Sequence, residues 1–266
     1  MKIDKRKNYI LVLDVETAGD VEKNPLCYDV GFVVADKKGN IYEEHSFAIS
    51  EIFDDDALMR SAYYYTKLPL YREKISQGIM KVKPFRYVRR VILNIVEKYG
   101  IKKVAAYNAY FDFVKALNNT WQELTNYPFF FPYEVGKNLE INCIWNMACQ
   151  TIFSQKSFPK WAFENGYYSK AGNLKTNAEV AFNWMMKTTD FIEEHTGLAD
   201  VYIETQIMAW CYRQHKKMNK KINRFCWRIP TKVHSEKISE IFSEWIFVGI
   251  RQQNLFIFLF IFLCCR

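Results

Sequence analysis

The chain has 266 residues, of which 50% are hydrophobic and 25% are charged, so wholesale disorder, collagen and coiled coil are excluded. The net charge of +8 is unevenly placed, because residues 1–212 carry 26 basic and 26 acidic side chains whereas residues 213–266 carry 11 and 3. We therefore expect one neutral domain over residues 1–212 and a basic C-terminal extension over residues 213–266 that ends in an apolar tail.

The seven cysteines are an odd number, and their spacing does not indicate a disulfide framework. The N-terminal residues lack the apolar stretch of a signal peptide. The apolar run at residues 255–265 spans 11 residues, whereas a membrane helix needs roughly 20. That run is compatible with a buried strand, a partner-docking tail or an extension without a selected role. We expect a reduced, cytoplasmic protein with no membrane span.

The first half of the chain predicts strands and then helices. Apolar runs of strand length occur at residues 9–14, 30–35 and 41–49. Residues 37–40 are typical of a hairpin turn between the last two strands. The segment 54–99 reads as helical, with breaks around Pro69 and Pro84.

The second half alternates between the two kinds of element. We expect short strands at residues 104–107 and 139–142, and helices at residues 111–121, 143–153, 173–186 and 198–212. Three antiparallel strands followed by alternating helix and strand predict an α/β fold with a central mixed five-stranded sheet flanked by helices.

The first group of candidate site residues follows the first strand. Alternation along an extended chain places Asp14 and Glu16 on one side and Val15 on the other. Ligand sites in open α/β sheets lie beyond the carboxyl ends of strands. Two close carboxylates repel each other unless a cation neutralises them. Taken alone, an Asp-x-Glu pattern is weak evidence for a site.

Two further groups stand where strand or loop gives way to helix. Asn108, Phe111 and Asp112 follow the fourth strand, and Asp112 taken by itself is more typical of an N-terminal helix residue stabilised by the helix dipole. His195 lies in the loop before the last helix, and Asp200 falls in the first turn of that helix. A single histidine is more often structural than catalytic.

Together, Asp-x-Glu-Thr, Asn-x-x-Phe-Asp and His-x-x-x-x-Asp resemble the signature of the DEDDh 3′–5′ exonuclease family. That family includes the proofreading epsilon subunit of bacterial replicative DNA polymerase, ribonuclease T and oligoribonuclease. The resemblance spans roughly residues 9–212. This sequence differs from many members of that family at Tyr107, where a histidine is common, and in its longer segment 54–103.

The resemblance implies a ribonuclease H-like fold and metal-dependent hydrolysis at the 3′ end of a nucleic acid. Oxygen-rich carboxylates suit Mg²⁺ or Mn²⁺, and two ions per site would be held by Asp14, Glu16, Asp112 and Asp200. His195 would be the general base. Candidate substrate contacts are Thr17, Asn108 and Phe111, of which Phe111 is equally compatible with a core position.

The sequence is compatible with three functions. The first is a 3′–5′ exonuclease on single-stranded DNA ends, with DNA replication, repair or proofreading as its setting and a polymerase or a second copy as a partner. The second is an RNA-processing exonuclease, because sugar choice depends on contacts to the 2′-OH that no motif reveals. The third is an inactive nucleic-acid-binding module, which has no use for four converging carboxylates.

Basic residues form two further groups. Eight lysines and arginines at residues 67–90 are opposed by Glu73 alone, and they are compatible with a polyanion-binding face or with a solvated helix face. Residues 213–232 combine basic and aromatic side chains, a pattern that suits single-stranded nucleic acid as well as a solvated helix.

Overall fold

The computed structural model describes residues 3–4, 6–215 and 218. In this part of the chain, six strands form one mixed sheet with the order β4-β3-β2-β1-β5-β6. The strands are β1 (Ile10–Asp20), β2 (Asn24–Ala35), β3 (Ile41–Ile49), β4 (Lys81–Lys83), β5 (Lys103–Ala106) and β6 (Glu140–Cys143). β1, β2 and β3 pair in antiparallel fashion, whereas β4, β5 and β6 run parallel to their neighbours.

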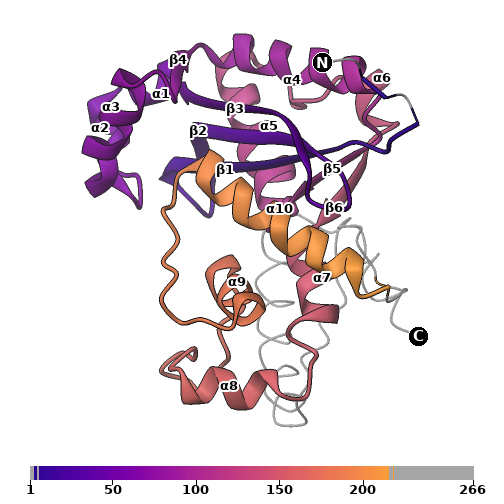
Figure 1. Ribbon diagram of the computed structural model, residues 1–266. Helices are drawn as coiled ribbons and strands as arrows, with labels where there is room; N and C mark the ends of the chain where they lie inside the picture. The colour runs from indigo at the N-terminus through magenta and orange to yellow at the C-terminus, as the bar shows by residue number, and fades with distance from the viewer. Residues whose placement is uncertain (1–2, 5, 216–217, 219–266) are drawn as a thin grey trace, which may run out of the picture. The chain divides into compact units, whose positions relative to one another are not determined.

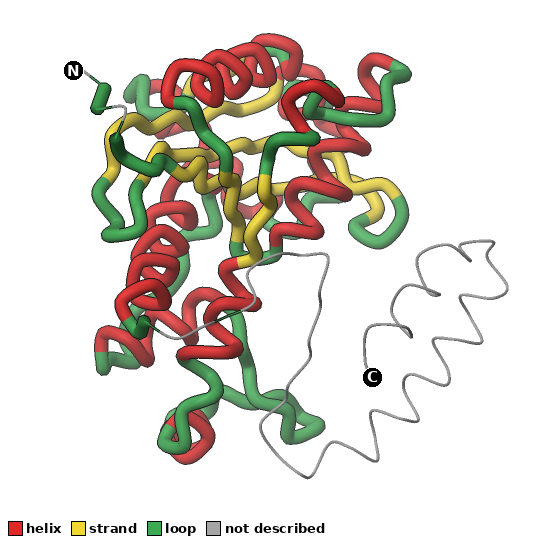
Figure 2. Tube along the Cα trace, turned by 90° about the vertical axis from the view of Figure 1, so that its right-hand side faces the viewer, coloured by secondary structure: helices red, strands yellow, loops and turns green. Residues whose placement is uncertain are grey.

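Helices cover both faces of the sheet (Figures 1 and 2). One face packs against α4 (Phe85–Tyr99) and α5 (Leu117–Thr125), and the other against α7 (Ile144–Thr151) and α10 (Gly197–Arg213). The remaining helical segments are α1 (Ser50–Phe53), α2 (Asp56–Met59), η1 (Tyr65–Lys67), α3 (Leu68–Ser76), η2 (Tyr110–Ala116), α6 (Tyr133–Gly136), α8 (Phe158–Glu164) and α9 (Ala178–Met186).

β1 supplies side chains to both cores because successive residues of a strand point to opposite faces. Leu11 and Leu13 belong to the core under α4, and Ile10 and Val12 belong to the core under α10. Each of these four side chains is at most 1% exposed. Burial of such apolar surface stabilises the fold by about 25 cal/mol per Å². On the face of the sheet that packs under α10, the first residues of β1 are apolar.

The α/β class and the mixed sheet expected from the sequence are confirmed, but the sheet has six strands instead of five. The additional strand is β4, which pairs in parallel with the end of β3. It has only three residues, Lys-Val-Lys, so it carries no apolar run from which a strand could be predicted. The break expected around Pro69 coincides with the boundary between η1 and α3, and Pro69 lies in the first turn of α3, which suits a residue without a backbone N–H.

β1 is longer than the apolar run that predicts it, and this corrects the expected position of the first candidate group. Its pairing with β2 continues to Asp20 and Asn24, with a register shift between Glu16 and Thr17. Asp14 and Glu16 therefore lie within the strand and not beyond its carboxyl end. We expect the strand to end at these polar residues. Hairpin pairing with β2 instead satisfies their backbone N–H and C=O groups, so β1 continues beyond them.

The last described helix, α10, ends at Arg213, one residue beyond the expected helix end. The expected basic extension and its apolar tail lie almost wholly outside the described residues. No helix in the described part of the chain is both long and apolar enough to cross a membrane.

Candidate active site

Two carboxylates replace the apolar side chains along the α10 face of β1. Asp14 and Glu16 follow Ile10 and Val12 in the same alternation, and both are half-buried. Val15 between them is buried in the opposite core. The register with β2 places Asp14 opposite Gly31 and Glu16 opposite Asp29. One face of the strand thus changes from core to acidic surface within a few residues.

A close backbone contact brings α10 to this acidic face. A Cβ added to Gly31 would lie 2.1 Å from the Gly197 carbonyl carbon, so only glycine permits this approach. The Gly197 backbone N–H also donates to Oδ2 of the buried Asp29 at 2.8 Å. The first turn of α10 therefore lies directly against β2, beside the strand position of Asp14.

Asp200, in that first turn, meets His195 and Glu16. One candidate ligand atom from each of the three residues lies within 4.8 Å of the others. The His195 backbone N–H donates to Asp200 Oδ1 at 3.2 Å, and His195 Nδ1 lies 4.0 Å from Asp200 Oδ2. Residues from β1, from a loop and from α10 thus lie close together.

Asp112 reaches the same region from η2, the helical turn after β5. The turn starts where the backbone N–H groups of Phe111 and Asp112 both donate to the Asn108 carbonyl, at 2.7 and 3.2 Å. The Asp112 side chain is buried. Burial raises the pKa of Asp112 to about 8, and hydrogen bonds from backbone amides, including that of Val15, oppose this rise. The amide of Val15 lies between Asp14 and Glu16, so Asp112 adjoins that pair.

The electrostatics of the cluster are those of crowded carboxylates, whose burial and mutual repulsion outweigh the attraction of the nearby Lys67. Burial, followed by repulsion from Glu204, Asp112, Asp200 and Glu16, raises the pKa of Asp14 well above its usual value. Burial and the nearby Asp200 raise the pKa of Glu16 to about 9. Burial raises the pKa of Asp200 to about 8. A divalent cation would relieve this repulsion, and oxygen donors are what Mg²⁺ and Mn²⁺ prefer.

The cluster contains three acidic residues that sequence reasoning missed. Glu204 is buried one turn after Asp200, and its Oε2 accepts from the Tyr107 backbone N–H at 3.2 Å. Glu193 Oε2 lies 3.9 Å from His195 Nδ1. Asp29 is fully buried beside Glu16 on the neighbouring strand. The helical spacing of four residues was a signal for Glu204, whereas Asp29 is revealed only by the register of the hairpin.

The three candidate substrate contacts occupy different environments. Thr17 is buried in β1 opposite Cys27, directly after the register shift. Asn108 is exposed at the start of the η2 turn. Phe111 is partly buried and packs against the core under α4.

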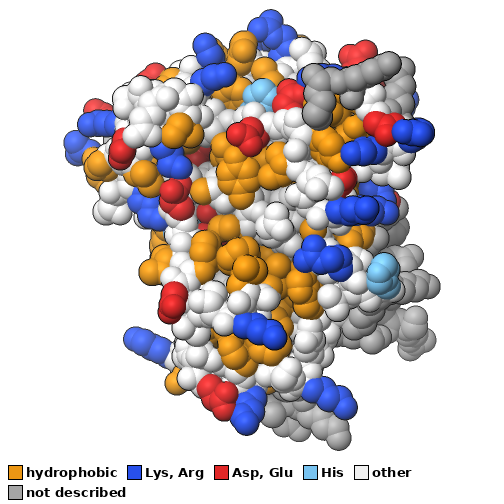
Figure 3. Space-filling model, viewed as in Figure 1, with side chains coloured by type: hydrophobic (Ala, Val, Ile, Leu, Met, Phe, Trp, Pro, Cys, Tyr) orange, Lys and Arg blue, Asp and Glu red, His pale blue; other side chains and the backbone are white. Residues whose placement is uncertain are grey.

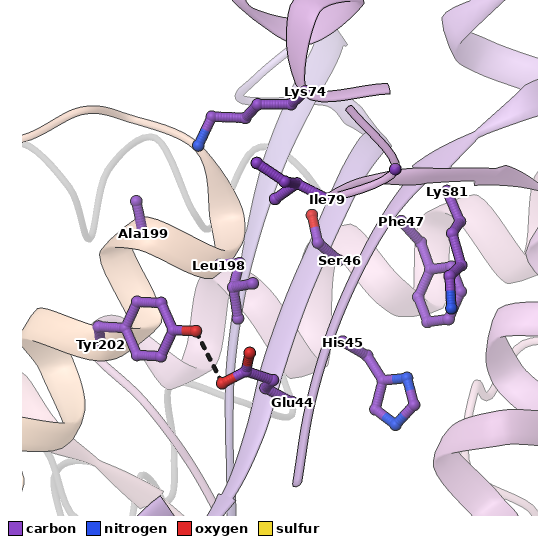
Figure 4. A pocket seen from close by; sticks show the side chains of 11 residues that line it. Glu44, His45, Ser46, Phe47, Lys74, Ile79, Lys81, Leu198, Ala199 and Tyr202 are labelled. Atoms are coloured by element: carbon purple, nitrogen blue, oxygen red, sulfur yellow. Dashed lines mark hydrogen bonds between the residues drawn. The ribbon is translucent and has the colours of Figure 1, made fainter. Parts of the chain in front are cut away.

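Acidic side chains gather on the surface near the first turn of α10 (Figure 3). A surface cavity of about 360 Å³ lies on another side of α10, between that helix, β3 and the turn before β4 (Figure 4). None of the predicted site residues lines this cavity. The candidate active site combines the buried side chains of Asp112 and Asp200 with the half-buried side chains of Asp14, Glu16 and His195.

The mixed sheet with helices on both faces defines a ribonuclease H-like fold of the kind found in exonucleases. Over 80% of the chain, the structure is similar to one described as "3′-end specific recognition of histone mRNA stem-loop by 3′-exonuclease", with a TM-score of 0.56, 10% identity and 85% of that chain covered. A full-length 3′-exonuclease matches with a TM-score of 0.54 at 10% identity, covering 80% of this chain and 85% of its own. No protein-family model and no curated protein sequence matches this chain.

Proposed function

We propose that this chain is a DEDDh-type, metal-dependent 3′–5′ exonuclease that removes nucleotides from single-stranded DNA ends. The observation that carries the proposal is the convergence of Glu16, His195 and Asp200, with candidate ligand atoms within 4.8 Å of one another. A histidine five residues before the last aspartate, within reach of it, is the arrangement on which the sequence resemblance rests.

The acidic residues fit a pair of divalent cations. Asp14, Glu16, Asp112 and Asp200 supply only carboxylate oxygens, and their raised pKa values mark a site where negative charge is crowded. Bound Mg²⁺ or Mn²⁺ would stabilise the charge that develops on the attacking and leaving oxygens of the scissile phosphate. A module that only binds nucleic acid would gain nothing from such crowding, because phosphates carry the same charge.

His195 is suited to accept a proton from the attacking water. Burial and the nearby Lys67 lower its pKa, whereas Glu179 opposes the shift. A lowered pKa favours the neutral imidazole, which is the form that can act as a base. Nδ1 lies 4.0 Å from Asp200 Oδ2 and 3.9 Å from Glu193 Oε2, so the imidazole lies at the edge of the acidic cluster.

RNA is the second candidate substrate. The exonuclease with a TM-score of 0.56 to this chain is described as recognising a histone mRNA stem-loop. The choice between RNA and DNA depends on contacts to the 2′-OH.

A degradation time course tests the proposal. End-labelled single-stranded DNA, duplex DNA and RNA are incubated with the protein and Mg²⁺, Mn²⁺ or EDTA. We expect shortening from the 3′ end only with a divalent cation, fastest on single-stranded DNA, and no shortening by the Asp14→Asn variant. Asp190→Asn, a change at an exposed aspartate outside the cluster, is the matched control. Nucleotide release in EDTA or by Asp14→Asn would refute the metal assignment, and faster degradation of RNA would favour the second candidate.

A further inference from the structure

One face of the helical segment 64–74 lies against the loop that carries His195. The segment comprises Tyr64, η1 and the part of α3 that ends at Lys74. Its contacts with loop residues 194–196 come from four side chains at a spacing of three, four and three residues: Tyr64, Lys67, Tyr71 and Lys74. This spacing places all four on one side of a helix.

The two lysines hold the loop on either side of the histidine. Lys67 Nζ donates to the Glu194 carbonyl. Lys74 Nζ donates to Glu194 Oε1 at 2.5 Å and to Thr196 Oγ1 at 3.3 Å. The Lys74 side chain is only 17% exposed, and its amine extends toward the start of α10 (Figure 4). The residues before and after His195 are therefore both attached to this face.

The two tyrosines contact His195 itself. The Tyr64 ring stacks on the imidazole, with centroids 4.3 Å apart and planes inclined by 12°. The Tyr71 hydroxyl lies 3.5 Å from the His195 carbonyl oxygen and donates to Asp29 Oδ2 at 3.0 Å. Asp29 Oδ2 also accepts from the backbone of Gly197, the first residue of α10. The stacked ring of Tyr64 and the hydroxyl of Tyr71 thus connect His195 to the helical segment 64–74 and, through Asp29, to the start of α10.

The loop needs such support because its backbone is disfavoured. His195 has a φ of 56°, in the left-handed region that residues with a Cβ seldom occupy. Asp200 holds one side of the histidine through the backbone N–H, and the Tyr64 ring covers a face of the imidazole. Without the ring, the side chain would have further rotamers open to it.

We propose that this face, the loop clamp formed by Tyr64, Lys67, Tyr71 and Lys74, is a positioning element that holds the His195 imidazole beside Asp200 before substrate binds. The inference rests on the proposed function, in which His195 is the general base. The clamp lies in the segment whose length departs from the resembling family. Tyr64 acts through His195 and makes no contact with substrate.

Substitutions of Tyr64 test the clamp through kinetics. Tyr64→Ala should lower kcat about 10- to 100-fold with KM unchanged, since misplacement of a reacting group by about 1 Å can cost 10²-fold. Tyr64→Phe keeps the stacked ring and should retain a kcat within about twofold of wild type. Tyr63→Ala is the matched control, because Tyr63 is 83% exposed and contacts the Tyr64 ring but not the histidine.

A double-mutant cycle separates positioning from substrate contact. In a His195→Ala background, Tyr64→Ala should cause no further loss of kcat, because the residue through which it acts is gone. Additive losses, or a raised KM with unchanged kcat, would show that Tyr64 contacts the substrate and would overturn the clamp.

Proton NMR tests the clamp independently of activity. The stacked ring should shift the His195 imidazole protons upfield in wild type and Tyr64→Phe, and the shift should vanish in Tyr64→Ala. The chain has four histidines, so the His195→Ala spectrum assigns the signal. Equal shifts in wild type and Tyr64→Ala would overturn the clamp. A wild-type protein that shows the shift but degrades no substrate would refute the proposed function and leave the clamp supported as a structural contact.

Discussion

His195 combines a backbone in the left-handed region with a side chain whose pKa is lowered. Its φ of 56° is held by hydrogen bonds and a stacked ring, and its imidazole pKa is lowered chiefly by burial. Carboxylates of Glu193 and Asp200 lie near Nδ1 and would stabilise the imidazolium that forms when a proton is accepted. In the proposed function, such an arrangement favours transfer of a proton from the attacking water to the imidazole.

Replacement of this histidine should affect turnover far more than stability. General-base assistance typically contributes about 10²–10⁴-fold, so His195→Ala should lower kcat by that order. The side chain is 26% exposed, so we expect the melting temperature to change little. Turnover and thermal unfolding are measured on the same preparation. His45→Ala, which removes a half-buried histidine outside the acidic cluster, is the control. A lower melting temperature with unchanged specific activity would instead indicate a structural role.

At the scale of elements, the site depends on how closely α10 approaches the sheet. The helix crosses the strand pair where Gly31 of β2 meets Gly197, its own first residue. That contact places Asp200 beside Asp14 and Glu16, and Glu204 one turn further along the same helix. Two positions without side chains therefore determine the spacing of the acidic cluster.

A methyl group at this contact should separate the two elements. In Gly31→Ala the new Cβ would lie 2.1 Å from backbone atoms of Gly197 and Leu198, so strand or helix must shift. We expect a loss of about 3 kcal/mol or more in the free energy of unfolding, with reduced metal-dependent activity. Urea unfolding and the nuclease assay measure both. Gly136→Ala is the control, since its Cβ would have 3.6 Å to the nearest atom. A wild-type urea midpoint for Gly31→Ala would contradict the close packing.

At the scale of the whole molecule, the structure divides the basic stretch at residues 67–90. Lys67 and Lys74 face the His195 loop, and the Arg89 guanidinium lies 4.2 Å from the Trp121 ring centroid and donates to the Phe130 carbonyl. Arg86 and Arg90 are exposed. The stretch is therefore neither a uniform polyanion-binding face nor a uniformly solvated helix face.

The crowded carboxylates make the stability of the metal-free protein depend on pH. The pKa values of Asp112 and Asp200 rise to about 8, and that of Glu16 rises to about 9, whereas unfolded carboxyl groups titrate near pH 4. The folded state therefore binds more protons between pH 4 and pH 9. The free energy of unfolding should fall as pH rises through this window.

Thermal unfolding in EDTA at pH 5, 7 and 9 measures this dependence. Mn²⁺ should raise the melting temperature more at pH 8 than at pH 6, because cation binding competes with protons. A cation at 100 times its Kd adds about 2.7 kcal/mol. Asp14→Asn should weaken the effect of Mn²⁺. A melting temperature that rises between pH 5 and pH 9 in EDTA would contradict the electrostatic account.

The basic extension is tested by its removal. Truncation after His215 keeps the whole of α10 and deletes the basic and aromatic residues that follow. If these residues contact phosphates, the shorter chain should bind single-stranded DNA more weakly and with a flatter salt dependence, because fewer counterions are released. Fluorescence anisotropy at several salt concentrations measures both. Unchanged affinity and salt slope would show that the extension does not contact nucleic acid.

The sequence by itself determined the α/β class, most strands and the approximate bounds of α10. The expected strand at residues 41–49 agrees with β3, and the expected helix at 198–212 lies within α10. Motif spacing also singled out Asp14, Glu16, Asp112, His195 and Asp200, all of which lie in the acidic cluster. Such features are readable because apolar periodicity and residue spacing are local properties of the chain.

Only the tertiary structure decided what lies beside these residues. β4 has no apolar pattern of its own and exists because it pairs with β3. Asp29 joins the cluster through the register of a hairpin, and Tyr64 reaches His195 across 131 positions of sequence. Gly31 and Gly197 are unremarkable in sequence until helix and strand meet. These contacts are non-local, so packing between elements establishes them and no window of sequence contains them.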